Sequence, residues 1–457
     1  METTFDVRIS EKIQTNTLAR GRHSYTVRWR VAKEPFKKNF GNLTLAKSER
    51  SRLMSAVGRG EAFYIDTGRP ISEARTLSKV TFYEVSCEYV DANWPRAAAN
   101  TRRSIADALV AVTPVMLKGR KSGPDAKALR KALQNWAFNT AHRERASDEV
   151  RALLTWVERG SRPFADLAKA DVIRATLGAV GSKLDGKPAS STYAARRRAV
   201  LWNLCEFGVE KGYLSANPIS TVKWSRPKRS GGTEVVDPAT VPNPQQAEAL
   251  LDAVGSLPGS GPRLKAFFGS MYYAALRPGE AVELSESNLR IPSAGRGRLF
   301  LTGSTPWAGG SWTVSGDERD ARQLKHREIG AGRWTPCPSK LTALLHWHLE
   351  TYGVDRDGHL FWGQRGGLVP GKTYQAAWGA ARVAALGEDL ARTSNLARRP
   401  YDLRHAAVST WLASGVEAKR VAEWAGQSLE VLMRIYAKVL DGLEEEAMER
   451  IDSFLLG

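Results

Sequence analysis

The sequence predicts a mainly α-helical, multidomain protein with small β-sheets. At 457 residues the chain exceeds one ordinary hydrophobic core, and typical domain sizes predict roughly two to four domains. Apolar residues recur at helical spacing through most of residues 77–222 and again from 242 to the C-terminus. Apolar and polar residues alternate, as in strands, only in short stretches such as 25–31 and 299–302.

Residues 25–31 form the clearest strand of the sequence. Every second side chain is apolar, and the other face of the strand carries Arg28 and Arg30. Basic side chains on a sheet face suit contact with DNA, and a solvated outer face explains them equally well.

The N-terminal unit is completed by a second strand and a helix. Residues 33–35 turn the chain into a strand over 36–40, and a helix is expected over 44–58 with Thr44 as its N-cap. Residues 1–75 are therefore expected to form a small sheet with one helix.

Residues 76–225 are predicted to be a helical domain, with breaks at 118–124, 160–163 and 181–188. Its clearest helix begins at Ser191. In that helix a basic run lies one turn away from the apolar stripe, formed by Arg196, Arg197 and Arg198. Such a run is usually a solvated face, but in a strongly basic chain it is a candidate phosphate-contacting surface.

A basic linker follows at residues 226–240 and separates this domain from a C-terminal one at 241–457. Its basic residues are Arg226, Lys228 and Arg229, and glycines follow them. Such a composition suits an exposed connection that lies along a duplex.

Within the C-terminal domain the pattern predicts helices near 247–254 and over 264–276. The second is expected to end at Arg277, because Pro278 disfavours helical geometry in the residue before it. Short strands are expected at 299–302 and 312–314.

Composition favours a nucleic-acid partner. The formal net charge is +19, an excess that would repel itself unless a polyanion is bound. The cysteines, Cys87, Cys205 and Cys337, have no spacing typical of a disulfide framework or a zinc site. Residues 1–10 lack the apolar core of a secretion signal and no stretch reaches the length of a membrane span, so a cytoplasmic protein is expected.

Two further segments are candidates for chemistry. In residues 401–405 Asp402 is expected to cap a helix, which places Arg404 in its first turn, where a guanidinium and the helix N-terminus suit a bound anion. A last helix is expected from Ser428, with Tyr436 on its apolar stripe. On its own, such a tyrosine is usually a core residue.

Three segments follow one another along the C-terminal domain: AALRPGE at 274–280, YDLRH at 401–405 and MRIY at 433–436. Arg404 follows Arg277 by 127 residues, and Tyr436 follows Arg404 by 32. Together they resemble the two arginine boxes and the nucleophile box of the tyrosine recombinases, most closely the integrases of actinobacterial phages and mobile elements. The resemblance is clear over about 240–445 and weaker over 1–225.

This resemblance implies roles for individual residues. Arg277 and Arg404 would grip the scissile phosphate, Tyr436 would attack it, and Lys325 would protonate the leaving 5′ oxygen. The family often has His at the position of Tyr401 and His or Trp at that of Gln427, so the residue at 427 departs from the pattern. Two permanently charged guanidiniums can hold a phosphodiester without a metal, so no cofactor is expected.

The resemblance also implies a multidomain recombinase architecture, in which 1–75 binds arm-type DNA sites, 76–225 binds the core site and 241–457 is catalytic. The expected partner is double-stranded DNA carrying attachment sites, bound by a homotetramer in a bacterial cytoplasm, at the nucleoid. A directionality factor or a host DNA-bending protein is a further expected partner.

Two alternatives stay open. A type IB topoisomerase shares this chemistry without a defined partner site, and a DNA-binding regulatory homologue with a decayed site would explain Gln427. Other polar residues are assigned structural roles. Glu280 is expected to orient Arg277, and His346, His348 and His359 lack metal-ligand spacing.

Overall fold

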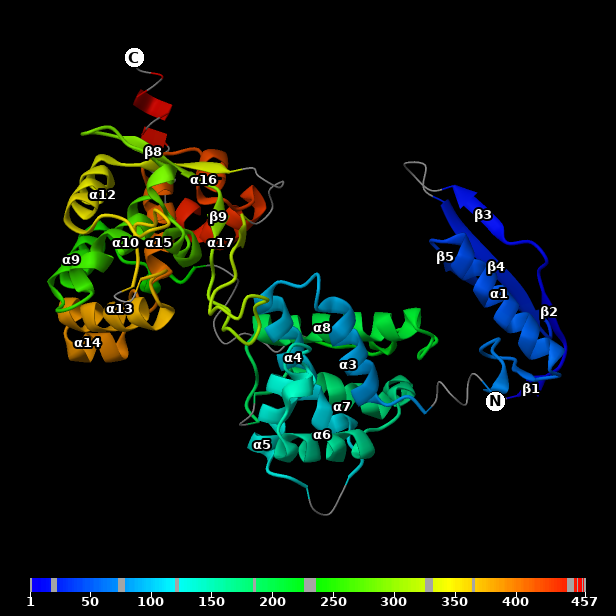
Figure 1. Cartoon of the computed structure of the whole chain (residues 1–457). Helices are drawn as coiled ribbons and strands as arrows, with labels where there is room; N and C mark the ends of the chain where they lie inside the picture. The colour runs from blue at the N-terminus through cyan, green and yellow to red at the C-terminus, as the bar shows by residue number, and fades with distance from the viewer. Residues whose placement is uncertain are drawn as a thin grey trace. The chain divides into compact units, whose positions relative to one another are not determined.

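A computed structural model describes residues 2–17, 23–72, 79–119, 123–183, 186–225, 236–324, 332–363, 366–441, 448–449, 451–453 and 455. The chain divides into two compact units, Met1–Lys228 and Arg229–Gly457. The predicted class holds, because both units are mainly helical with small sheets (Figure 1). The linker residues Arg226, Lys228 and Arg229 lie outside the described residues.

The N-terminal part of the first unit is an antiparallel sheet around one long central strand, β4. The strand β5 pairs along one edge of β4, while β2 and β3 follow each other along the opposite edge. A separate pair, β1 with β6, lies outside this sheet. The bounds are β1 Thr3–Thr4, β2 Val7–Ile9, β3 Gln14–Thr17, β4 His23–Val31, β5 Glu34–Phe40, α1 Leu43–Gly58 and β6 Phe63–Tyr64.

The helix α1 covers the apolar face of this sheet (Figure 1). The alternation predicted for 25–31 is present, since Val27, Trp29 and Val31 are buried while Arg28 and Arg30 are exposed. The N-cap lies two residues earlier than expected. Asn42 is the N-cap, because its side chain accepts the Thr44 N–H at 2.7 Å.

The helical part of the first unit forms a bundle in which α4 packs against α8 and α7. Its turns fall near the predicted breaks. The bounds are α3 Phe82–Asn93, α4 Ala99–Val112, η2 Thr113–Met116, α5 Ala126–Ala132, η3 Leu133–Ala137, η4 Arg143–Arg145, α6 Asp148–Gly160, η5 Phe164–Ala168, α7 Ala170–Val180, α8 Ser191–Glu210 and η6 Pro218–Thr221.

The basic run of α8 does not form one exposed surface. Arg196 is exposed, whereas Arg197 is buried at 5% exposure. The Arg197 guanidinium donates to Asp107 Oδ2 at 3.0 Å and to the Ser182 carbonyl at 3.0 Å. Burial and the ion pair with Asp107 of α4 leave the Arg197 guanidinium little exposed surface for the DNA contact that the sequence predicted.

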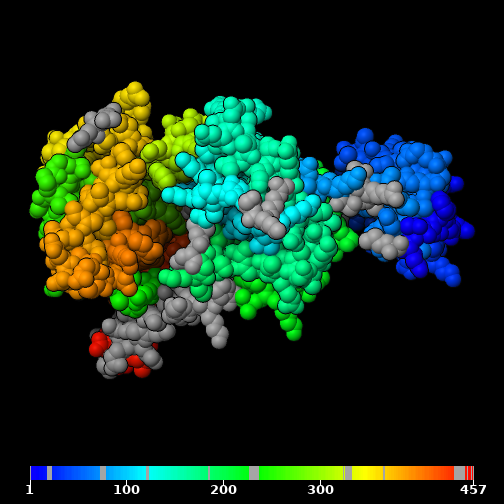
Figure 2. All heavy atoms as spheres, turned by 90° about the horizontal axis from the view of Figure 1, so that it is seen from below, coloured from blue at the N-terminus to red at the C-terminus, as the bar shows by residue number. Residues whose placement is uncertain are grey.

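The second unit contains the remaining helices and two small sheets, β11-β8-β7 and β10-β9. Figure 2 shows α13 and α14, in orange, on its surface. The bounds are η7 Pro238–Thr240, α9 Pro244–Ser256, α10 Gly261–Tyr273, α11 Pro278–Val282, η8 Glu286–Asn288, β7 Leu289–Arg290, β8 Gly297–Leu301, β9 Gly303–Ser304, β10 Arg322–Gln323, β11 Arg333–Cys337, α12 Ser339–Tyr352, α13 Gly371–Leu386, α14 Glu388–Thr393, α15 Asp402–Ala413, α16 Ala418–Ala425 and α17 Leu429–Asp441.

The core of this unit forms around α10, which packs against α9, α12 and α15. Its buried aromatic residues Phe267, Phe268 and Trp378 lie in one cluster with residues of β8 and α15. A smaller cluster joins α15, α16 and α17 and contains Tyr436. No helix among the described residues is both long and apolar enough to cross a membrane.

Two predicted elements differ in this unit. The helix expected over 264–276 ends at Tyr273, because Ala275 adopts a left-handed φ of 51° that a helix cannot include. The strand expected over 312–314 is a turn, folded back by Gly309 and Gly316 at φ of 90° and 84°. The strand that pairs with β9 is β10 instead.

Candidate active site

The first arginine box forms a sharp connection between α10 and α11. Pro278 at the first position of α11 fixes the start of that helix, and Arg277 is its N-cap. The Arg277 backbone N–H donates to Glu280 Oε2 at 2.8 Å, and Nη1 donates to Oε1 at 2.9 Å. Glu280 thus orients Arg277 from one turn away, as the sequence predicted.

Glu280 is also paired with a second arginine, Arg333, at the start of β11. Arg333 Nη1 and Nη2 contact the two carboxylate oxygens at 2.6 and 2.9 Å, and the side chains are 1% and 2% exposed. Burial alone would raise the pKa of Glu280, but Arg333 and then Arg277 lower it to about 2. The carboxylate is therefore ionised at every physiological pH and neutralises part of the charge gathered here.

The second arginine box opens α15. Arg404 lies in the first turn, as predicted, and is 1% exposed. Asp402 is not the predicted cap: its carboxylate accepts from the Arg399 backbone N–H and guanidinium, both at 2.8 Å. Burial lowers the pKa of Arg404, and the neighbouring charge of Arg277 lowers it further. An anion placed beside both guanidiniums would relieve this repulsion.

The C-terminal end of α16 holds the three arginines together. Three successive carbonyls each accept one guanidinium N–H. The pairs are Arg333 Nε with Trp424 O at 3.0 Å, Arg404 Nη2 with Ala425 O at 2.5 Å and Arg277 Nη2 with Gly426 O at 2.7 Å. The last carbonyls of a helix have no intrahelical donor and carry the negative end of its dipole, so they suit cations. Arg404 also donates to the Ala275 carbonyl, in the left-handed turn after α10.

The nucleophile box lies on α17, which is kinked at Tyr436. This residue has φ of −109° and ψ of 18° inside the helix and is 2% exposed. The Ile435 carbonyl accepts the Val236 N–H at 2.9 Å, so the first described residue of the linker is bound to the kink. Burial raises the pKa of Tyr436, while Arg404 and Arg277 act in the opposite direction.

Two aromatic side chains of α15 border the tyrosine. His405 Nδ1 lies 2.8 Å from the Tyr436 hydroxyl, and its ring packs edge-on against Tyr401 at 5.1 Å. Arg404 Cζ lies 6.0 Å from the centre of the Tyr401 ring. Burial would lower the pKa of Arg277, but Glu280 and then Tyr401 raise it, so Tyr401 also borders the first arginine.

Gln427 follows Gly426, whose carbonyl binds Arg277. Its side-chain Nε2 is buried and has no hydrogen-bond partner in the described part of the chain. A buried donor without an acceptor costs free energy, so this atom is available to an incoming anion.

The structure thus brings together five of the six predicted catalytic residues: Arg277, Tyr401, Arg404, Gln427 and Tyr436. Lys325 follows β10 and lies outside the described residues. Arg28, Arg30 and Arg196 belong to the first unit and are exposed there.

The sequence interpretation missed two residues of the site, His405 and Arg333. His405 stands inside the second arginine box, but its partner lies 31 residues away on a kinked helix. Every second residue of β11 is buried, and these residues are Arg333, Thr335 and Cys337. An arginine among inward-facing positions of a strand is the signal that could have revealed it.

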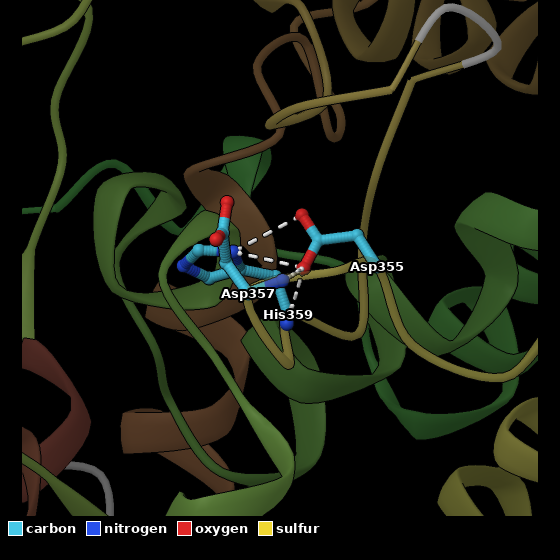
Figure 3. Close-up of side chains that lie close together, drawn as sticks. All are labelled: Asp355, Asp357 and His359. Carbon is cyan, nitrogen blue, oxygen red and sulfur yellow. Dashed lines mark hydrogen bonds and ion pairs between the residues drawn. The ribbon is translucent and has the colours of Figure 1, made fainter.

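Asp355, Asp357 and His359 are also close together, with potential ligand atoms within 4.8 Å (Figure 3). Asp355 Oδ1 accepts the backbone N–H groups of Asp357 and His359 at 2.9 and 2.8 Å, and His359 Nδ1 lies 3.1 Å from Oδ2. These hydrogen bonds close the turn after α12 and occupy the Asp355 carboxylate. These three side chains therefore lie close together because they form this turn.

No protein-family model matches the sequence, and no curated protein matches it. Among solved structures, the chain is similar to the Tn1549 transposon integrase in complex with a circular intermediate DNA, at 14% identity and a TM-score of 0.48, over 67% of this chain and 94% of that one. A lambda integrase dimer bound to a COC′ core site is 13% identical, with a TM-score of 0.47 over 92% of this chain and 93% of that one. The XerH site-specific recombinase bound to palindromic difH substrate is 14% identical, with a TM-score of 0.44 over 79% and 98%. At these values the similarities decide neither the activity nor the catalytic residues.

Proposed function

We propose that this chain is a tyrosine-type site-specific DNA recombinase that cleaves and rejoins DNA through a 3′-phosphotyrosine intermediate. The observation that carries the proposal is the convergence of Arg277, Arg404 and Tyr436 beside the C-terminal end of α16. These residues come from three elements far apart in the sequence, and no packing requirement explains two guanidiniums gathered beside a buried phenol.

The geometry suits a phosphodiester as the bound anion. Arg277 and Arg404 would hold its non-bridging oxygens, and Gln427 Nε2 would complete the set of donors. In the reaction Tyr436 attacks phosphorus, the 5′ oxygen leaves, and the protein retains a 3′-phosphotyrosyl bond. Attack of a partner strand's 5′ hydroxyl on this bond rejoins the DNA without a nucleotide cofactor. Lys325 remains our candidate for the acid that protonates the leaving oxygen.

The N-terminal sheet offers a surface for a second DNA contact. On its polar face Arg8 lies directly opposite Arg30, and Arg28 lies directly opposite Lys37. All four are exposed. Like charges in opposite positions of a sheet destabilise it, so this arrangement favours a polyanionic partner. We therefore propose that 1–75 binds arm-type sites, that the bundle of 76–225 binds the core site, with Arg196 as a contact, and that 226–240 follows the duplex between them.

Integration or excision of a mobile element is the proposed role, carried out by a homotetramer on two attachment sites. The resemblance of the three boxes to actinobacterial integrases supports this assignment. A type IB topoisomerase would share the chemistry of Tyr436, but an additional basic sheet at the N-terminus fits a recombinase better.

The test is covalent capture on a supercoiled plasmid that carries the DNA flanking the coding region. Protein and plasmid are mixed and quenched with detergent, and protein-linked DNA is measured. The wild type should form an adduct, and Tyr436→Phe should form none while binding the plasmid equally well, because it loses one hydroxyl and no charge. A normal adduct yield from Tyr436→Phe would sink the proposal.

A plasmid without the flanking DNA distinguishes the rival functions. Relaxation of that plasmid at the same rate would favour a topoisomerase. Binding without any adduct on either plasmid would favour a regulatory DNA-binding homologue.

A further inference from the structure

The hydrogen bond between His405 and Tyr436 bears directly on how the phenol could lose its proton. The two residues lie on different helices, and 2.8 Å separates Nδ1 from the hydroxyl oxygen. The described residues offer Tyr436 no other hydrogen-bond partner. The phenol is 2% exposed, so water does not freely replace this contact.

The proton in this contact belongs to Tyr436. Burial lowers the pKa of His405 to about 4, and Arg399 and Arg404 lower it as well, while Asp402 opposes them. The imidazole is therefore neutral near pH 7, and in the tautomer protonated at Nε2 its Nδ1 is an acceptor. His405 is only partly buried.

Among the described residues around Tyr436, no other group can remove a proton at neutral pH. Arg277 and Arg404 stay protonated, and the amide of Gln427 is not a base. Tyr401 is itself a phenol. The Asp402 carboxylate is buried and engaged with Arg399.

We propose that His405 is the proton acceptor for Tyr436 in the cleavage step, an inference that rests on the proposed function. As Oη forms its bond to phosphorus, the Oη–H bond breaks and the proton moves to His405 Nδ1. The bond from phosphorus to the 5′ oxygen breaks at the same time, and that oxygen takes up a proton from the general acid. In rejoining, the imidazolium returns its proton to the departing phenol.

The site is arranged to accept this charge once DNA is bound. Among the described residues, the charged groups that border His405 are Asp402, Arg399 and Arg404, with Tyr436 on the facing helix. The phosphate brings a negative charge into the same site, which favours the imidazolium and opposes the effects of burial and the arginines. A base in contact with the reacting hydroxyl typically accelerates a reaction by about 10²- to 10⁴-fold.

The experiment measures single-turnover adduct formation on the plasmid with the flanking DNA, for the wild type, His405→Ala and His405→Asn, from acid to neutral pH. Asparagine is the matched control, because its amide oxygen can accept the Tyr436 hydrogen bond at the place of Nδ1 but cannot take the proton. Thermal unfolding and plasmid binding verify that each variant is folded.

We expect a loss of about 10²- to 10⁴-fold for both variants at neutral pH. The wild-type rate should fall as the pH drops through the pKa of His405, because the imidazolium cannot accept a proton, and the Asn variant should lack this decline. Full activity of His405→Asn would overturn the proposal and leave His405 a positioning residue. Full activity of His405→Ala would overturn both roles. An inactive wild type, by contrast, would contradict the proposed function itself.

Discussion

At Gln427 a buried amide nitrogen lies next to the carbonyl that binds Arg277, without an acceptor in the described residues. The sequence resemblance implies a ring N–H at this position, and an amide N–H can make the same hydrogen bond to a phosphate oxygen. Gln427 therefore departs from the expected residue type but still offers an N–H donor.

Gln427→Leu should slow adduct formation by about 10²- to 10³-fold, the usual loss for one aimed donor. Its stability should not fall, since no hydrogen bond is lost in the free protein. Gln427→His should remain active. Cleavage rates on the flanking-DNA plasmid, with urea unfolding as the stability control, decide between a donor and a packing residue. Equal rates for leucine and glutamine would mean that Gln427 only fills space.

Glu280 should dominate the acid stability of the catalytic unit. Its folded-state pKa is about 2 against an ordinary value of 4.5. The stabilisation is thus present above about pH 4.5 and is lost as the pH falls toward 2. Glu280→Gln leaves Arg333 and Arg277 without their counter-charge and should cost about 3–5 kcal/mol at neutral pH.

Urea unfolding of Glu280→Gln at several pH values tests this expectation. The variant should lose the part of the acid dependence that the wild type shows between pH 4.5 and 2. Glu423→Gln is the matched control, because its pair with Arg420 is exposed and should be worth about 0–1 kcal/mol. If the two variants lose equal stability, the ion pairs of Glu280 contribute no more than an exposed surface pair.

At this scale the sequence predicted most of the site and missed the contacts that long-range packing creates. Arg277, Arg404 and Tyr436 stand in recognisable segments. His405 contacts Tyr436 where α17 kinks, and no local pattern predicts that kink. Helical spacing also failed to predict that Arg197 would find Asp107, 90 residues away.

Among the elements, the short helix α16 positions the arginines of the site. Its C-terminal carbonyls accept three guanidiniums, and Gly426 ends the helix with a left-handed φ of 63°. A Cβ at Gly426 would lie 3.0 Å from Arg333 Cδ, Nε and Cζ. No pattern in the sequence indicates that this helix end organises the site.

Gly426→Ala should therefore damage both stability and activity. The left-handed backbone costs about 1 kcal/mol for a non-glycine residue, and the contact with Arg333 adds to it. Gly387→Ala is the control, since Gly387 has φ of 81° and no atom within 4 Å of its Cβ position. Both variants should be destabilised in urea, and only Gly426→Ala should lose adduct formation. Normal activity of a folded Gly426→Ala would show that the arginines do not depend on this helix end.

In the whole molecule the basic sheet and the catalytic site belong to different compact units. The basic, glycine-rich composition predicts a linker over 226–240, of which residues 226–235 lie outside the described residues. The sheet itself was predictable because a period of two exposes alternate side chains. The turn at 312–314 was not predictable. It depends on the left-handed φ angles of Gly309 and Gly316, which the alternation of apolar residues does not reveal.

Deleting residues 1–75 should abolish recombination between full attachment sites while cleavage of a short core site persists. The milder double variant Arg28→Ala with Arg30→Ala should bind full sites more weakly, with a salt dependence reduced by about 2 in the log–log slope. Recombination assays and binding at several salt concentrations measure these effects. A truncated protein that recombines full sites normally would exclude an arm-binding role for the sheet.

The most direct measurement is mass spectrometry of the trapped adduct after digestion with protease and nuclease. The central claim predicts a single nucleotide-bearing peptide, with a 3′-phosphate attached to the oxygen of Tyr436. A nucleotide attached to any other side chain, or to a 5′-phosphate, would contradict it.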